Sequence, residues 1–254
     1  MSDRRDVIYV YDGTFDGLLS AVFESYASRR LPAAIVENEH VQENFLYAYQ
    51  TILTDTAKAR RVSAAVENKI SAQALQTLYY AFLSNVPEKG RLCLDYIRAG
   101  FRLGRELDLH LRLDCVSKLQ NAALQVKNET HQYLGFVRFA ELEGGVFYSG
   151  IQPKNHVLPL LSAHFVRRLP QNPWMIHDTN RRLCLVYNGR SCYIAPTDTI
   201  PKLRYSDGEG QYRRLWKLFY DTVEIQARHN ERCRMSHMPK RFWNNLPELN
   251  QPAD

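Results

Sequence analysis

The hydrophobic period of the chain changes near residue 131, and this change constrains the fold more than any other feature of the sequence. Between residues 56 and about 131 the apolar positions repeat with a period near 3.6, for example at Val116, Leu119 and Val126. Such a period is typical of amphipathic helices. From Gln132 the period becomes two, which is typical of strands. The sequence therefore predicts a helical block followed by a sheet.

The two patterns are not separated by a recognisable linker. No stretch rich in proline or in glycine and serine interrupts the helical block, and independent domains are usually joined by such stretches. We therefore expect a single domain over residues 1–254 that can be divided into two lobes. The first lobe, 1–131, is expected to be mostly helical with short N-terminal strands. The second lobe, 132–254, should hold an antiparallel sheet, a C-terminal helix and a docked tail.

The start of the chain predicts a strand, a helix and then further strands. Asp6 to Asp12 alternates in hydrophobicity and ends at an Asp-Gly turn, after which Thr14 can cap a helix with one apolar stripe. Residues 33–37 and 45–53 are suited to two more strands. The stretch YDGTFDG lacks the lysine and the glycine spacing of phosphate-binding loops, and its aspartates would repel an anion. We interpret it as a structural turn.

The second lobe contains a hairpin, a short helix, more strands and a last helix. The hairpin is expected around residues 143–145, and a helix over 156–169 tolerates its proline in the first turn. Strands follow between 174 and 195, and a helix over 211–228 carries an apolar stripe opposite a basic face. These elements predict the α+β class: an N-terminal strand-helix-strand unit, a central helical block and an antiparallel sheet with covering helices.

Composition excludes several classes of protein. Hydrophobic residues make up 45% of the chain and aromatic residues 11%, which suffices for a packed core. No stretch approaches the roughly 20 apolar residues of a membrane span, and the first residues lack the apolar run of a secretion signal. The five cysteines form no CxxC pair, so we expect reduced thiols. These features predict a soluble, cytoplasmic protein with no membrane partner.

Positive charge is concentrated near the C-terminus. The chain has a net charge of +6, and residues 213–241 hold eight lysines and arginines against three acidic residues. Cations neutralise phosphates and aromatic rings stack on bases, so a basic, aromatic segment suits nucleic-acid binding. A solvated cationic surface would have the same composition. The candidate nucleic-acid-binding residues are Arg138, Arg213, Arg214, Lys217, Arg234, Lys240 and Arg241.

The sequence contains no recognisable catalytic motif. It lacks a GxSxG elbow, a Walker A loop, the HxE and PCxxC of zinc deaminases, and the CxxxCxxC that holds an iron–sulfur cluster. We therefore assign no metal site. Glu141, His177 and Asp178 remain as candidates for a general base, but the last two are strand neighbours whose side chains face opposite ways. Whether the chain is an enzyme is left open.

The stretch HMPKRFWNNLPE, residues 237–248, is called the tail below. Two large aromatic residues, Phe242 and Trp243, lie in it. Rings of this size are strongly stabilised by burial, so we expect the tail to be docked by its aromatic side chains. Lys240 and Arg241 would then face a phosphate or a partner, and their joint replacement by alanine is predicted to weaken DNA binding uniformly across sequences.

Three stretches carry a resemblance to a known family. Residues 9–26 (YVYDGTFDGLLSAVFESY), 130–178 and 232–248 are similar to a bacterial family of probable DNA metabolism proteins, a domain of otherwise unknown function. Members are typically encoded beside a radical-SAM protein, and a similar domain occurs ahead of a uracil-DNA-glycosylase-like domain. The resemblance implies a role in DNA repair or modification. It also implies a radical-SAM partner that holds the iron–sulfur cluster and S-adenosylmethionine, with no cofactor on this chain.

Three functional hypotheses follow from the sequence. The first is a DNA-binding accessory protein that acts with the radical-SAM partner in DNA repair or modification. The second is a DNA-processing enzyme, for example a base-releasing hydrolase, that uses Glu141, His177 or Asp178 as its general base. The third is a scaffold that binds only the partner protein, in which case DNA affinity would arise only in the complex.

Overall fold

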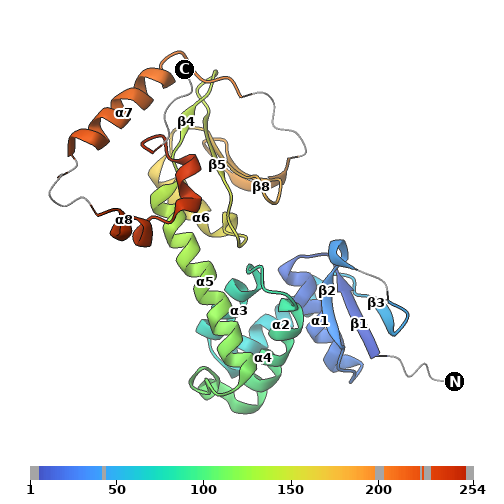
Figure 1. The fold of residues 1–254 in the computed structure, drawn as a ribbon. Coiled ribbons are helices and arrows are strands. Elements are labelled where there is room, and N and C mark those ends of the chain that lie inside the picture. The colour runs from blue at the N-terminus through green and yellow to red at the C-terminus, as the bar shows by residue number, and fades with distance from the viewer. Residues whose placement is uncertain (1–5, 42–43, 198–202, 224, 226–229, 250–254) are drawn as a thin grey trace. The chain divides into compact units, whose positions relative to one another are not determined.

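The computed structural model describes residues 6–41, 44–197, 203–223, 225 and 230–249 (Figure 1). The chain forms two compact units, the first ending at Lys127 and the second beginning at Asn128. Helix α5 (Asp114–Phe136) continues through this boundary. None of the helices in the described ranges is long and apolar enough to cross a membrane.

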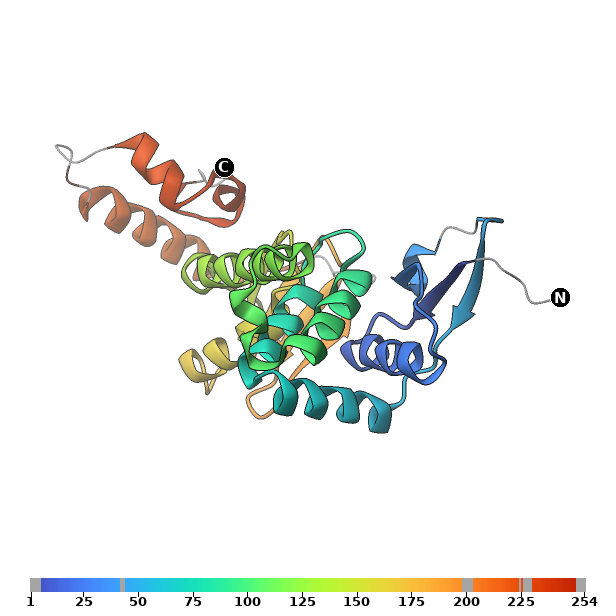
Figure 2. The ribbon, with the colours of Figure 1, turned by 90° about the horizontal axis from the view of Figure 1, so that it is seen from below.

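The first unit opens with a parallel sheet of three strands in the order β2-β1-β3. The strands are β1 (Asp6–Tyr11), β2 (Ala34–Glu37) and β3 (Tyr47–Thr51). Helix α1 (Phe15–Ala27) follows β1 and lies beside this sheet (Figures 1 and 2). The predicted strand-helix-strand unit is thereby confirmed.

The turn between β1 and α1 is closed by side-chain hydrogen bonds. Thr14 caps α1 as predicted, because its hydroxyl accepts the Gly17 N–H. Asp12 accepts the Thr14 N–H at 3.0 Å through one carboxylate oxygen, and the Thr54 hydroxyl at 2.7 Å through the other. The structural role predicted for the YDGTFDG stretch is therefore confirmed.

The helical block consists of four helices and one short 3₁₀ segment. Asp55 and Ser71 cap the first two helices by accepting backbone N–H groups. Gly100 allows close packing, since a Cβ there would lie 2.2 Å from a side-chain carbon of Ile70. Besides α5, the elements of the block are α2 (Thr56–Lys69), α3 (Ala72–Phe82), α4 (Lys89–Leu103) and η2 (Gly104–Leu109). A further 3₁₀ segment, η1 (Asn38–His40), lies between β2 and β3.

The second unit contains a five-stranded sheet in the order β4-β5-β6-β7-β8. Its strands are β4 (Ala140–Glu141), β5 (Phe147–Ile151), β6 (Trp174–Asp178), β7 (Leu183–Tyr187) and β8 (Cys192–Pro196). The α+β class and the hairpin turn at residues 143–145 are confirmed. The first strand of the hairpin is only two residues long, because residues 132–136, predicted to begin it, continue helix α5. The sheet is mixed rather than antiparallel throughout, because β5 and β6 run parallel. Helix α6 (Leu158–Arg168) makes the crossover connection that a parallel pair requires.

One face of this sheet forms the core of the second unit. Ile151, Trp174 and Ile176 belong to the same cluster of buried residues as Phe165 from α6. The tail also joins the core through Phe242, which is 2% exposed and lies between the rings of Tyr133 and Phe136, and through the fully buried Leu246. The predicted docking of the tail is confirmed. The remaining elements are α7 (Glu209–Val223), α8 (Glu231–His237) and η4 (Lys240–Asn245).

Helix α7 forms over most of its predicted range, although its apolar stripe is not part of the core. Leu215, Phe219 and Val223 are all more than half exposed. The corresponding stripe of α1 is buried at Leu18 and Val22. Similar periodicity thus produces a core helix in the first unit and a surface helix in the second.

Candidate nucleic-acid interface

The second unit contains a cleft of about 460 Å³. Its walls are the strands β4 and β5, the helix α7 and the tail. The cleft is lined by Arg138, Phe139, Ala140, Tyr148, Ser149, Gly150, Tyr205, Glu209, Arg213, Arg214, Lys217, Leu218, Asp221, Asn244, Asn245 and Pro247. The lining carries four cations and two carboxylates, so its net charge is +2.

Three of these cations, Arg213, Arg214 and Lys217, come from α7 and are called the α7 cations below. Arg213 donates to Glu209 at 2.7 Å, and its guanidinium lies 4.5 Å from the ring centre of Tyr205. Lys217 pairs with Asp221 one turn further along the helix, also at 2.7 Å. Arg214 is exposed and has no ion-pair partner among the described residues. The α7 cations therefore form a basic edge of the cleft.

Arg138 approaches the cleft from the segment before β4. Its guanidinium donates to Glu248 at 2.9 Å and lies 5.7 Å from the ring centre of Trp216. Glu248 is only 3% exposed, and its second oxygen accepts the indole N–H of Trp216 at 3.0 Å. This single tail carboxylate thus joins Arg138 to α7. The sequence contains no motif that would have identified Glu248.

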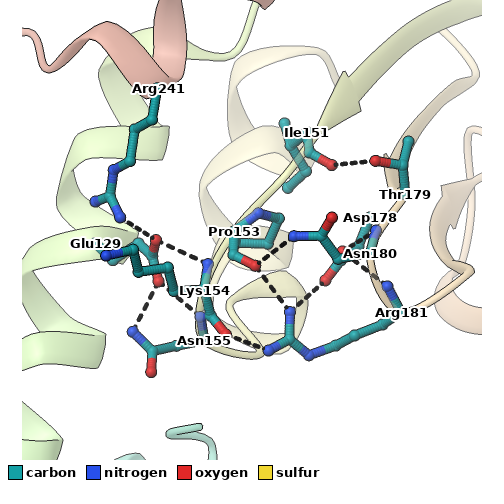
Figure 3. Close-up of polar contacts among 10 residues, drawn as sticks. All are labelled: Glu129, Ile151, Pro153, Lys154, Asn155, Asp178, Thr179, Asn180, Arg181 and Arg241. Atoms are coloured by element: carbon teal, nitrogen blue, oxygen red, sulfur yellow. Dashed lines mark hydrogen bonds and ion pairs between the residues drawn. The ribbon is translucent and has the colours of Figure 1, made fainter.

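The other three predicted cations do not line the cleft. Arg234 and Lys240 lie 5.0 and 5.8 Å from the ring centre of Trp243. Arg241 forms an ion pair with the buried Glu129 at 3.0 Å (Figure 3). It also donates to Gln132 at 2.9 Å. The charge of Arg241 is therefore balanced inside the protein rather than offered to a phosphate.

Glu129 organises the loop between β5 and α6. Its two oxygens accept the backbone N–H groups of Lys154 and Asn155 at 3.0 and 2.8 Å (Figure 3). The side-chain amide of Asn155 donates to it as well, at 2.7 Å. Together with Arg241, these donors satisfy a carboxylate that is 2% exposed. A buried charge requires such partners.

Asp178 organises the turn after β6. It is fully buried and accepts the N–H groups of Asn180 and Arg181, while the Arg181 guanidinium pairs with it at 3.0 Å (Figure 3). Arg181 also donates to the carbonyls of Pro153 and Lys154. Burial raises the pKa of Asp178, and the contacts from Arg181 counteract that rise. The arrangement fixes two loops, and Asp178 does not line the cleft.

Glu141 and His177 also lie outside the cleft lining. Glu141 accepts the Ser206 hydroxyl at 3.2 Å, and its backbone N–H donates to Glu209 at 2.9 Å. His177 is buried, and its Nδ1 lies 3.2 Å from the hydroxyl of Tyr148, which does line the cleft. Among the side-chain hydrogen bonds of the three candidates for a general base, only that of His177 reaches a residue that lines the cleft.

Burial gives His177 a pH-dependent contribution to stability. Desolvation lowers its pKa below the ordinary value of 6.5, and the nearby Asp178 counteracts this in part. The unfolded chain therefore binds a proton at His177 at a higher pH than the folded chain, and stability is lost as the pH falls through 6.5. We expect His177→Gln to flatten the decline of the unfolding free energy between about pH 7.5 and 5.5. Urea denaturation at several pH values measures this.

His164 supplies the control for that measurement. Burial and two nearby arginines lower the pKa of His164 as well. Some pH dependence of the unfolding free energy should therefore persist in His177→Gln, and it should decrease further when His164→Gln is added. An unchanged pH dependence in His177→Gln would contradict the assignment.

In the described part of the chain, no group of three or more His, Cys, Asp or Glu side chains is arranged to hold a metal ion.

Comparison with known proteins gives a family and no nearer relative. Neither the curated proteins nor the solved structures give a match to this chain. A family model described as a domain of unknown function, DUF4130, matches residues 87–248. The matched range includes the cleft and covers more than half of the sequence. The chain therefore belongs to the DUF4130 family.

Proposed function

We propose that the protein is a DNA-binding accessory protein that contacts phosphates through the basic edge of the cleft. The observation that carries this proposal is the convergence of predicted cations. Arg138 and the α7 cations are far apart in the sequence, and they line the same cleft. The charge of Arg138 is balanced by the buried Glu248, so Arg214 and Lys217 are the cations most open to a phosphate. Tyr205, an aromatic residue of the same wall that is 44% exposed, adds a surface on which a base can stack.

The ion pair of Lys217 with Asp221 does not oppose phosphate binding. Pairs on an exposed helix surface, such as that of Lys217 with Asp221, typically contribute only about 0–1 kcal/mol. A phosphate can therefore replace Asp221 at small cost, whereas Arg213 stays paired with the buried Glu209. Arg214, with no described ion-pair partner, can receive a phosphate directly.

The biological role rests on the family resemblance. It supports action in DNA repair or modification, together with a radical-SAM partner that would hold the iron–sulfur cluster and S-adenosylmethionine. The alternative of a base-releasing hydrolase has less support, because Glu141 and Asp178 are engaged in hydrogen bonds away from the cleft. The partner-binding scaffold remains an outcome that the experiment below distinguishes.

The test is a salt titration of the full chain binding to labelled single- and double-stranded DNA. Each phosphate contact contributes about 0.9 to the log–log slope for duplex DNA. Joint replacement of Arg213, Arg214 and Lys217 by alanine should therefore weaken binding to all sequences and lower that slope by about two units or more. The matched control removes Arg167, Arg168 and Arg190, which lie outside the cleft. The affinity and the salt slope of this control should stay closer to those of the unaltered chain than the values of the cleft variant do.

Two results would contradict the proposal. If the control variant loses as much slope as the cleft variant, binding is not directed by the cleft. If the chain binds DNA only when the radical-SAM partner is present, the scaffold hypothesis is favoured and the basic edge becomes a candidate protein interface.

A further inference from the structure

We propose that the cleft takes a single nucleotide unit, with its base held at the Tyr148–His177 pair and its phosphate at the α7 cations. This inference rests on the proposed function and assigns the ligand of the same cleft. It adds Tyr148 as the residue that contacts the base and His177 as the residue that positions the Tyr148 hydroxyl.

The backbone of β5 places Tyr148 for this role. Residues two apart in a strand project from the same face, and the residue two positions after Tyr148 is Gly150. A Cβ at Gly150 would lie 3.4 Å from the Tyr148 hydroxyl. The missing side chain therefore leaves room for the phenol to lie over the strand. Gly150 also pairs with His177 on the neighbouring strand β6.

His177 fixes the position of the Tyr148 hydroxyl. The hydroxyl oxygen and His177 Nδ1 are 3.2 Å apart, and His177 is buried whereas Tyr148 is partly exposed at the cleft. Burial also raises the pKa of Tyr148 to about 12, so the phenol stays neutral. A neutral phenol both donates and accepts hydrogen bonds, as do the edges of nucleic-acid bases.

The neighbouring thiol argues for binding rather than covalent chemistry at this position. Cys184 lies opposite His177 on β7. Burial raises its pKa to about 11, and a thiol that stays protonated is a poor nucleophile. Of the three side chains Tyr148, His177 and Cys184, we therefore assign the polar contact with a ligand in the cleft to the Tyr148 hydroxyl.

The size and lining of the cleft select the class of ligand. A volume of about 460 Å³ lies in the range of small-molecule pockets, roughly 300–1,000 Å³. The walls combine the aromatic residues Tyr148 and Tyr205 with the cations of α7. Rings suit a planar base, and cations suit a phosphate. A nucleotide unit has both groups at opposite ends.

The experiment separates the base from the phosphates. A short, end-labelled deoxyribose-phosphate strand without bases is compared with the same strand carrying a single base at its centre, for each of the four bases in turn. We expect at least one base to tighten binding to the full chain by about tenfold, since stacking of a base on an aromatic ring contributes about 1–3 kcal/mol. Tyr148→Ala should abolish this preference, and Tyr148→Phe should reduce it by about fivefold.

Further variants identify how His177 acts. His177→Gln should reduce the base preference. The double variant His177→Gln/Tyr148→Phe should lose no more of the base preference than Tyr148→Phe alone, because both substitutions act on the same hydroxyl. Tyr193→Phe is the matched control, since Tyr193 is exposed on β8 and lies outside the cleft. Removing the α7 cations should weaken binding of both strands and leave the base preference unchanged.

The outcomes distinguish the inference from the proposed function. Salt-dependent binding of both strands with no preference for a base, or a preference unchanged in Tyr148→Ala, overturns the nucleotide site and leaves phosphate binding intact. Absence of binding to either strand at low salt overturns the DNA-binding function itself.

Discussion

Replacing Phe242 by alanine should lower the free energy of unfolding of the second unit by about 3–5 kcal/mol, the usual cost of removing a buried phenylalanine from a packed core. Phe242 is among the least exposed side chains of the tail, and its ring centre lies 4.9 Å from that of Tyr133 and 4.9 Å from that of Phe136. The substitution would leave a cavity between the tail and α5.

Tryptophan fluorescence during chemical denaturation can measure this loss. All three tryptophans, Trp174, Trp216 and Trp243, belong to the second unit, so their emission reports its unfolding. Phe219→Ala is the control, because that ring is more than half exposed on α7. It should cost about 1 kcal/mol or less. A similarly small loss for Phe242→Ala would show that the tail does not stabilise the core.

Replacing Glu129 by alanine should destabilise the same unit by about 3–4 kcal/mol. The carboxylate accepts the N–H groups of Lys154 and Asn155 and the Asn155 amide, and it balances the charge of Arg241. Each buried donor that loses its acceptor costs about 1–3 kcal/mol, and water reaching the more exposed donors offsets part of that cost.

Two variants divide this effect between charge and hydrogen bonding. Glu129→Gln keeps one acceptor oxygen and should cost less than Glu129→Ala. Arg241→Ala removes only the partly exposed cation and should cost less still. The exposed Glu143→Ala serves as the control, and unfolding is followed as for Phe242. Equal stability of Glu129→Ala and Glu143→Ala would contradict a structural role for Glu129.

Local signals in the sequence were sufficient for most of the elements. The alternating strand before Asp12, the cap at Thr14 and the glycine hairpin are encoded within a few residues, so their prediction was confirmed. The pairing of strands is not local. Helix α6 was expected between β5 and β6, but the parallel direction of that pair depends on how the crossover packs against the sheet.

The cleft could be predicted only in part, because charge is visible in a sequence and charge pairing is not. The α7 cations were identified from the basic composition, and the structure places them on the cleft. Arg241 looked equivalent, yet it pairs with Glu129, which lies more than a hundred residues away. Tyr148 carried no motif, and its contact with His177 arises from pairing of β5 with β6.

The tail interleaves two kinds of positions, and this limits how it can evolve. Phe242, Leu246 and Glu248 are buried, whereas the asparagines at 244 and 245 and the proline at 247 line the cleft. Selection for a folded protein acts on the first set and selection for ligand binding on the second. Insertion or deletion of one residue just before Asn245 would bring Asn245 or Pro247 to the buried position of Leu246. This segment should therefore tolerate substitution at its cleft positions far better than a change in its length.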